Sequence, residues 1–475
     1  MVFSSPIFLT VFLPIVAVAM LLSPKALRNF VMLVASVVFY YWGAAFDTWV
    51  LLWVVGASFL GARAIHKSSG DSKLALGVTL LAVITPLLWF KYAAFFSDVG
   101  LDALSVIGVG GSALDARILP VGISFFTFQA LSYVLDVRSG AAEPLDRPDR
   151  HLLYIALFPQ LIAGPIVRYA EIREQLYDRV ITSDRLAVGA TRFAHGLAKK
   201  VIIADSVAPI SDAAFATGDG RTMLAAWVGL AAYTVQIYFD FSGYSDMAIG
   251  LGMMFGFTFP ENFARPYSSS SITEFWRRWH TTLSFWFRDY VYIPLGGSRD
   301  GPVATYRNLA IVFFLTALWH GAAWTFLVWG GLHGLWLILE RITGLGTTER
   351  MPLLRRALTL GIVMVAWVFF RAPTIGDASI YVVDLFSFSG GAVNPEIIVA
   401  MTASNTLMLA IGCASFLLPK DKIVGPWLSK LDLTGLATTA AGPQLVRMGY
   451  AVLAVPLSMA LIFANGFSPF LYFQF

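Results

Sequence analysis

The amino-acid sequence predicts an all-α protein that crosses a membrane many times, and three observations predict it. Hydrophobic residues make up 57% of the 475 residues and charged residues only 13%, whereas a soluble domain carries about 25% charged residues. Charge-free apolar runs recur along the chain, and about 17–25 such residues can cross a bilayer as a helix. The runs are continuous rather than alternating, so we expect their backbone to be satisfied within helices and not within a closed barrel.

The apolar runs follow one another along the whole chain. From their lengths we expect about 10–12 crossings, with the shorter runs forming re-entrant or interfacial helices. The polar connectors between them do not mark a domain boundary, so we predict one membrane domain over residues 1–475, which ends in an aromatic tail, 467–475. The runs cover residues 1–24, 29–46, 48–62, 74–90, 118–135, 152–167, 222–239, 308–339, 357–370, 397–419 and 448–475.

Basic residues between the runs predict the orientation of the chain, because lysine and arginine concentrate in cytoplasmic loops. One basic group follows the first run and another follows the third, which places the N-terminus outside. By the same argument the loop 420–447 is cytoplasmic, and the tail after the last run is outside. The residues that carry this argument are Lys25, Arg28, Arg63, Lys67, Lys73, Lys420, Lys422, Lys430 and Arg447.

Composition also excludes several classes of protein. The only cysteine is Cys413, which excludes a disulfide scaffold. The chain has 33 basic and 29 acidic residues and no basic run that would follow a phosphate backbone, so we expect no nucleic-acid partner. No spacing of histidine, cysteine and carboxylate residues predicts a metal site.

Ionisable residues inside apolar runs are costly and therefore suggest function. Asp240 and Asp246 lie in the segment Tyr238–Met247, which interrupts an otherwise apolar stretch. We expect these two carboxylates to be structural, bonded to backbone or to arginines of a neighbouring helix, with a functional role as the alternative.

The segment Ser271–His280 is too charged to face lipid and too aromatic for a solvated loop. A helix that lies at the interface, or that dips into a water-filled funnel, suits it best. Arg277 and Arg278 either bind the phosphates of an anionic substrate or anchor the helix at lipid headgroups. Trp276 and Trp279 are candidate substrate contacts beside them.

Histidines supply the candidate catalytic groups. His320 lies in the middle of the run 308–339, and an imidazole there is a natural general base because its unperturbed pKa of about 6.5 is near working pH. The alternative is a histidine that packs between helices and bonds to a neighbour. His280 is the next candidate and His333 the weakest of the three.

Six segments together resemble the membrane-bound O-acyltransferase (MBOAT) family, and more closely its bacterial alginate O-acetylase branch. The opening MVFSSPIFL is similar as well, so the resemblance covers nearly the whole chain. The segments are Leu119–Gly140, Leu157–Arg168, Tyr238–Gly252, Ser271–His280, Leu318–Trp324 (LWHGAAW) and Phe467–Phe475 (FSPFLYFQF).

The resemblance implies a funnel-shaped fold in which two histidines line a tunnel between the two faces of the bacterial inner membrane. The family's near-invariant histidine falls on His320 and its second active-site residue on His280. The implied acyl donor is cytoplasmic acetyl-CoA, used as a substrate, with no bound cofactor. A periplasmic SGNH-type acetyltransferase would then complete transfer to an exopolysaccharide, most closely alginate, although the branch also serves other polymers.

A mechanism follows from this resemblance. His320 would take the proton of the acceptor hydroxyl, while His280, with nearby tryptophan or arginine groups, would position the donor or stabilise the oxyanion. The tail resembles the aromatic C-terminal motif of a small partner protein in bacterial D-alanyl transfer. Tyr472 would therefore accept the acetyl group and pass it on, or else the tail is an interfacial aromatic anchor.

Two other classes of function remain open at this stage. In the first, the chain is a transporter or flippase of an activated group, and the histidines form a proton relay. No paired broken segments indicate inverted repeats, which counts against it. In the second, the chain is a structural scaffold for a polysaccharide synthase. For the acyltransferase, the transporter and the scaffold alike, we expect membrane lipids to surround the chain.

Overall fold

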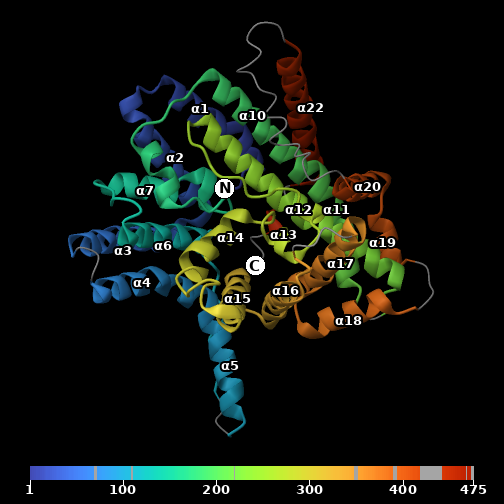
Figure 1. Cartoon of the computed structure of the whole chain (residues 1–475). Helices are drawn as coiled ribbons and strands as arrows, with labels where there is room; N and C mark the ends of the chain where they lie inside the picture. Colours follow the sequence, from blue (N-terminus) through green and yellow to red (C-terminus); the bar gives the residue numbers. More distant parts are fainter. Residues whose placement is uncertain are drawn as a thin grey trace. The chain divides into compact units, whose positions relative to one another are not determined.

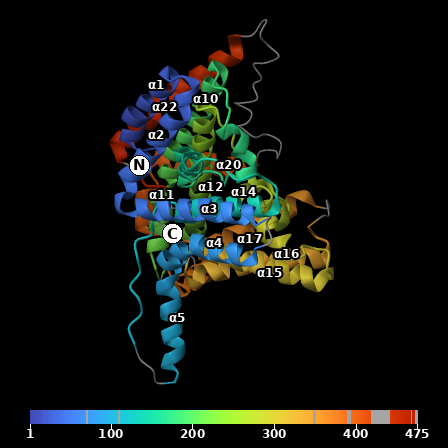
Figure 2. The same cartoon turned by 90° about the vertical axis from the view of Figure 1, so that its left-hand side faces the viewer.

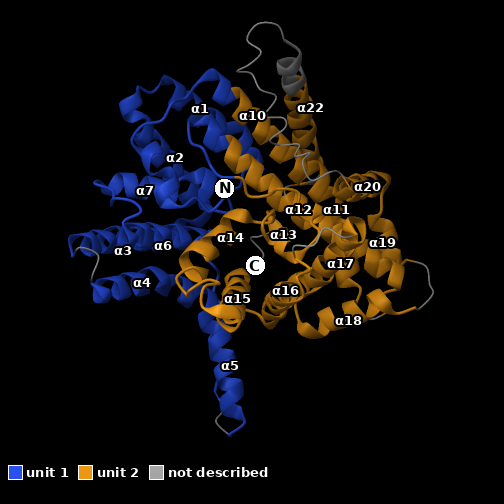
Figure 3. Cartoon of the chain, viewed as in Figure 1, with its two compact units in different colours: residues 1–186, 251–260 blue, residues 187–250, 261–475 orange. Residues whose placement is uncertain are grey.

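The computed structural model describes residues 1–68, 72–107, 111–218, 220–346, 351–388, 393–417, 441–466 and 468–471, without the side chains of 441–448 and 465. These residues form helices, turns and loops, and the described part of the chain contains no β-strand. They divide into two compact units, one of residues 1–186 and 251–260 and the other of residues 187–250 and 261–475 (Figure 3). The single-domain prediction stays a prediction.

Unit 1 is a bundle of apolar helices. In Figures 1 and 2, α5 (Ala93–Ser105) projects away from the other helices of this unit, and none of its residues is buried. In contrast, nearly every residue of α6 is buried, so this helix forms the centre of the unit's core. The other helices are α1 (Leu13–Leu22), α2 (Arg28–Ala44), α3 (Thr48–Lys67), α4 (Lys73–Leu87), α6 (Ile123–Ser139), α7 (Pro148–Ala156), α8 (Phe158–Leu161) and α9 (Tyr169–Ile172).

Unit 2 contains every candidate catalytic residue that the structure describes. Two long helices, α10 and α12, continue across the boundary between the units. A π-helical segment, η6 (Lys199–Ala204), joins α10 to α11. The helices are α10 (Ser183–Ala198), α11 (Asp205–Ala216), α12 (Met223–Met254), α13 (Ile272–Trp276), α14 (Thr281–Phe287), α15 (Gly301–His320), α16 (Trp324–Thr343), α17 (Pro352–Arg371), α18 (Ile375–Phe386), α19 (Pro395–Ala400), α20 (Ala403–Leu417) and α22 (Ala441–Asn465).

The predicted all-α membrane fold is confirmed. Five helical stretches of the described chain are long and apolar enough to cross a membrane, and three shorter apolar helices accompany them. The number of crossings stays a prediction. The five long stretches are Lys25–Lys67, Lys73–Ser105, Met223–Met254, Gly301–His320 and Pro352–Arg371, and the shorter ones are Phe8–Leu22, Ala403–Leu417 and Gly449–Ala464.

The run 308–339 is not one span, which corrects the position of His320. Helix α15 ends at His320 and α16 begins at Trp324, so the two form a hairpin (Figure 1). A side chain at Gly321 would collide with the ring of Phe326, and a Cβ at Gly330 would lie 2.6 Å from the Cβ of Ala317. The glycines therefore permit a tight turn and close helices, and His320 ends a helix instead of lying within one.

Two other runs are also broken. The run 152–167 divides between α7 and α8, and the run 397–419 divides between α19 and α20. Leu157 separates the first pair, with non-helical backbone at φ −54° and ψ 107°. Apolar composition alone therefore overestimated the length of these helices.

Glycines set the packing of α10 against α12. A Cβ built on Gly243 would lie 2.7 Å from the carbonyl oxygen of Gly196, and one on Gly250 would lie 2.6 Å from that of Gly189. Such small residues let helix backbones approach closely, as is common in membrane bundles. The close approach brings the basic residues of α10 and η6 within reach of the carboxylates of α12.

Candidate functional site

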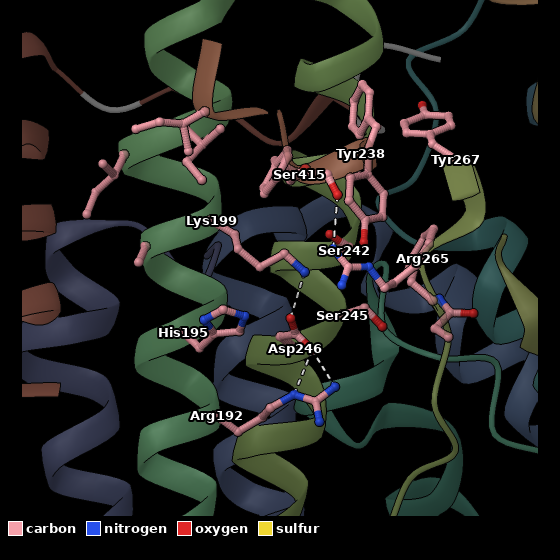
Figure 4. Close-up of a pocket in the computed structure, with 18 of the residues that line it drawn as sticks. Arg192, His195, Lys199, Tyr238, Ser242, Ser245, Asp246, Arg265, Tyr267 and Ser415 are labelled. Atoms are coloured by element: carbon pink, nitrogen blue, oxygen red, sulfur yellow. Dashed lines mark hydrogen bonds and ion pairs between the residues drawn. The ribbon is translucent and has the colours of Figure 1, made fainter. Parts of the chain in front are cut away.

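The acidic segment of α12 does not interrupt the helix. Residues 238–247 are helical throughout, and nearly all of them are buried. Asp246 accepts hydrogen bonds from Arg192 Nε at 2.6 Å and from Lys199 Nζ at 2.9 Å (Figure 4). Arg192 also forms an ion pair with Glu261, with 2.7 Å between Nη2 and Oε2. Asp246 is therefore enclosed by cations of the neighbouring helix.

Asp240 has a different environment. Its Oδ1 lies 2.9 Å from Nζ of Lys200, and that ammonium group also donates to Oδ1 of Asp205 at 2.6 Å. Its other oxygen, Oδ2, accepts the backbone N–H of Leu471 at 2.8 Å. The carboxylate and Lys200 are both 3% exposed. Asp240 thus joins α12 to the last residues of the chain.

The described part of the tail, residues 468–471, packs against the same helix. The ring of Phe470 stacks on Tyr244 with centroids 4.6 Å apart, and it lies 5.7 Å from the ring of Phe241. The carbonyl of Pro469 accepts from Lys200 Nζ at 3.4 Å. Tyr472, the predicted acyl carrier, lies outside the described residues, as does most of the loop 420–447.

His280 is held in a fixed orientation. Its Nδ1 lies 3.1 Å from Oδ1 of Asn262, and the same oxygen accepts from the Thr282 hydroxyl at 2.8 Å. The histidine has left-handed backbone at φ 43° and is fully buried. Left-handed non-glycine residues are strained and cluster at functional sites. His280 lies outside the long apolar stretches, and its burial lowers the pKa of the imidazole to about 3.

His320 is enclosed by aromatic rings and is 3% exposed. Its ring centroid lies 4.7 Å from that of Trp329 and 5.2 Å from that of Phe370. Trp319 contacts both candidate catalytic histidines, with centroids 5.7 Å from His280 and 4.8 Å from His320. The structure therefore brings together two histidines that are 40 residues apart in the sequence.

His333, the weakest catalytic candidate, lies deeper in the same aromatic group. Its ring is parallel to that of Phe275 at 5.9 Å and lies 5.2 Å from that of Trp329. Neither ring nitrogen has a hydrogen-bond partner among the described residues. Its environment is that of a side chain that packs between helices.

The segment Ser271–His280 forms one short helix and a turn. Trp276 and Trp279 are buried, whereas Arg277 is exposed. Arg278 is committed to protein partners, since it donates to Oε1 of Glu274 at 3.1 Å and to the carbonyl of Ala264 at 3.0 Å. The two arginines, treated alike from the sequence, therefore differ in their availability to a substrate.

Glu340 fixes the start of this short helix. Its two carboxylate oxygens accept the backbone N–H groups of Ile272 at 2.6 Å and of Thr273 at 2.9 Å. N–H groups in the first turn of a helix have no acceptor within the helix, and a negative charge is favourable at this end. Sequence reasoning missed Glu340, Asn262 and Lys200, because each acts on a residue at least 18 positions away.

A cavity of about 370 Å³ lies beside these groups in unit 2 (Figure 4). Charged residues Arg192, Lys199, Asp246, Glu261 and Arg265 line it together with polar residues such as His195 and Ser242, and aliphatic and aromatic side chains form much of the rest. Asn262, the partner of His280, also lines it. The cavity therefore reaches the partner of His280, although neither His280 nor His320 is among the residues that line it.

Apolar helices long enough to span a bilayer, with buried ionisable groups among them, define a polytopic membrane protein with a polar interior. Such an interior serves either transport or catalysis. Residues 35–373 match the family model of the membrane-bound O-acyltransferases (MBOAT). The chain belongs to this family, as its motifs predicted, and it is a multi-pass membrane enzyme that transfers acyl groups.

Several relatives support this assignment. A probable alginate O-acetylase of Azotobacter vinelandii is 40% identical over the full length of both chains. A peptidoglycan O-acetyltransferase of Helicobacter pylori is 35% identical over 80% of this chain and 78% of its own. A teichoic acid D-alanyltransferase of Bacillus subtilis is 28% identical over 45% of this chain and 56% of its own. Their names differ in acyl group and acceptor but share acyl transfer.

Proposed function

We propose that this enzyme moves an acetyl group from cytoplasmic acetyl-CoA across the bacterial inner membrane for O-acetylation of an exopolysaccharide, alginate or a related polymer. The observation that carries the proposal is the meeting of His280 and His320 on one buried tryptophan, Trp319. Full-length similarity to a probable alginate O-acetylase supports the choice of acetyl group and polymer. In this proposal both chain termini face the periplasm.

In the proposed reaction His320 is the general base. It takes the proton of the acceptor hydroxyl as the oxygen attacks the acetyl carbonyl, so that the new C–O bond replaces the thioester C–S bond. The proton then passes to the leaving thiolate, and CoA departs as the free thiol. Aromatic rings around His320 exclude water, which suppresses loss of the acetyl group by hydrolysis.

His280 positions the donor in this scheme. Its Nδ1 faces the carboxamide oxygen of Asn262, which can only accept, so the neutral ring carries its proton on Nδ1. The other nitrogen, Nε2, is then an acceptor, suited to an amide N–H of the CoA arm. The cavity of about 370 Å³, which Asn262 also lines, has the size and enough apolar surface for such an arm. Trp276 and Trp279 support His280 from the same segment, and exposed Arg277 suits a CoA phosphate better than Arg278.

The acceptor in this proposal is Tyr472. A phenol of pKa about 10 requires a base to attack a thioester at neutral pH, and His320 fills that role. The acetyl ester of Tyr472 then passes to a periplasmic SGNH-type acetyltransferase, which acetylates the polymer. Docking of residues 469–471 against α12 supports a tail that works inside the enzyme instead of anchoring it at the interface.

The test is thiol release from acetyl-CoA by the full chain in nanodiscs, with and without the periplasmic partner. We expect wild type to release thiol and the folded His320→Ala variant to lose at least about 100-fold, a usual contribution of a general base. His333→Gln is the matched control and should retain most of the activity. Equal release by wild type and His320→Ala would contradict the proposed base. A protein that releases no thiol but conducts flux of an activated group would be a transporter.

A further inference from the structure

Residues 469–471 of the tail are held by several contacts within unit 2. The backbone N–H of Leu471 donates to Oδ2 of Asp240 at 2.8 Å, inside unit 2. Phe470 is 1% exposed and Leu471 6% exposed. A buried carboxylate is therefore bonded to one particular backbone amide, 231 residues further along the chain.

Lys200 completes this arrangement. Its ammonium group pairs with Asp240 at 2.9 Å and with Asp205 at 2.6 Å, and it also donates to the carbonyl of Pro469 at 3.4 Å. The pair of Asp240 and Lys200 thus bonds one backbone acceptor and one backbone donor, two residues apart in the tail. Backbone groups are alike at every residue, so these two bonds hold the tail in place, while the stacking of Phe470 on Tyr244 selects the register. Hydrogen bonds to ionised groups are also the stronger ones.

The register matters because the tail segment is connected to His280 through a single ring. Phe241, next to Asp240 in α12, lies 5.7 Å from Phe470 and 4.8 Å from His280, measured between ring centroids. A shift of the tail by one residue would bring a different side chain to the position of Phe470. Consecutive Cα atoms are about 3.8 Å apart, more than the tolerance of a reacting group.

We propose that Asp240 and Lys200 form a clamp that holds the C-terminal tail in one register, with Leu471 at Asp240, so that the next residue is presented for acyl transfer. The inference rests on the proposed function for its consequence, since Tyr472 is that next residue. The clamp residues are positioning residues, because they hold the tail and touch no reacting atom. This gives the acidic segment of α12 a role beyond packing.

The first arm of the test changes the tail and leaves the helices untouched. Leu471→Pro removes the N–H that Asp240 accepts and also replaces the side chain, while Leu471→Ala keeps the N–H and controls for the loss of the side chain. In nanodiscs with the periplasmic partner, we expect Leu471→Pro to lower kcat for thiol release at least about tenfold, as loss of a charge-assisted bond implies. KM for acetyl-CoA should stay unchanged, and Leu471→Ala should remain within about threefold of wild type. Wild-type kcat in Leu471→Pro, or a change confined to KM, would overturn the clamp.

The second arm does not depend on activity. Hydrogen–deuterium exchange of the peptide 466–475 should be at least about tenfold slower in wild type than in Asp240→Ala, because a bonded amide exchanges only when the tail detaches. Equal exchange in the two proteins would overturn the clamp. If the proposed function is wrong but the clamp is present, the results differ from this. Wild type and His320→Ala would then release thiol equally, while wild type would still exchange more slowly than the Asp240 variant.

Discussion

Asp240 and Asp246 lie six residues apart on the same buried helix, yet they do different things. Asp246 is bonded to two cations of the neighbouring helix segment, Arg192 and Lys199. Asp240 shares one cation, Lys200, with Asp205 and uses its second oxygen for the tail. Six residues correspond to faces about 120° apart on a helix. The difference shows that the role of a buried carboxylate in a membrane protein depends on its bonding partners and does not follow from its burial.

The largest effect on stability is expected from Asp246→Ala. The substitution leaves Lys199 without its carboxylate, and removal of one partner from a buried ion pair costs about 3–5 kcal/mol. Denaturant unfolding in nanodiscs, followed by tryptophan fluorescence, measures the free energy of unfolding. Asp184→Ala, at an exposed position in the first turn of α10, is the control and should change it by less than about 1 kcal/mol. A loss from Asp246→Ala as small as that of the control would contradict the structural role of Asp246.

Asp240→Ala should destabilise the protein by less, about 1–2 kcal/mol, because Lys200 keeps its bond to Asp205. It should nevertheless lower kcat for thiol release at least about tenfold, as expected for Leu471→Pro. Both quantities are measured on one preparation, by unfolding and by thiol release. If the two aspartates prove equally important for stability, the contrast drawn between them is wrong.

A pH series separates the contribution of His280 to the free energy of unfolding from the contributions of Asp240 and Asp246. Burial lowers the pKa of His280 to about 3, from about 6.5 in the unfolded chain. Between these values the unfolded state binds the proton and the folded state does not. Stability is therefore complete above about pH 6.5 and falls as pH drops toward 3, by at most about 1.4 kcal/mol per pH unit.

The measurement is the free energy of unfolding at several values between about pH 6 and about pH 4. Wild type should lose stability more steeply than His280→Gln, by about 1 kcal/mol per pH unit. Identical slopes for the two proteins would mean that His280 is not buried as a neutral ring.

The smallest effect is expected from Glu261→Gln. Glu261 pairs with Arg192 but its side chain is 49% exposed, and exposed ion pairs contribute about 1 kcal/mol or less. The change in unfolding free energy should stay below that value and shrink further in high salt, because salt screens exposed charges. A large, salt-independent loss would show that Glu261, and not Asp246, is the principal partner of Arg192.

The sequence predicted the helical fold because the length and the apolar composition of each run are local properties of the sequence. It could not predict the turn at Gly321, since a long apolar run has the same composition whether it forms one helix or a hairpin. The close packing of Phe326 leaves no room for a side chain at position 321, so the turn requires a glycine there. This requirement depends on packing, and a pattern of hydrophobicity does not record packing.

The candidate site was predictable in part for a similar reason. His280 and His320 were identified because polar groups in apolar surroundings stand out locally. Asn262, which orients His280, and Lys200, which pairs with Asp240, did not stand out. An asparagine in a proline-rich loop and a lysine beside another lysine are ordinary residues in a sequence, and only the fold gives them their partners.

The close approach of α10 and α12 at Gly196 and Gly243 has a consequence for motion. Where two backbones touch with no side chain between them, there is no rotamer that can change to let the helices separate gradually. We therefore expect α10 and α12 to move together during turnover. Met408 and Ile411 of α20 also line the cavity, and their side chains can change rotamer, so we expect changes in the shape of the cavity to come from the α20 side.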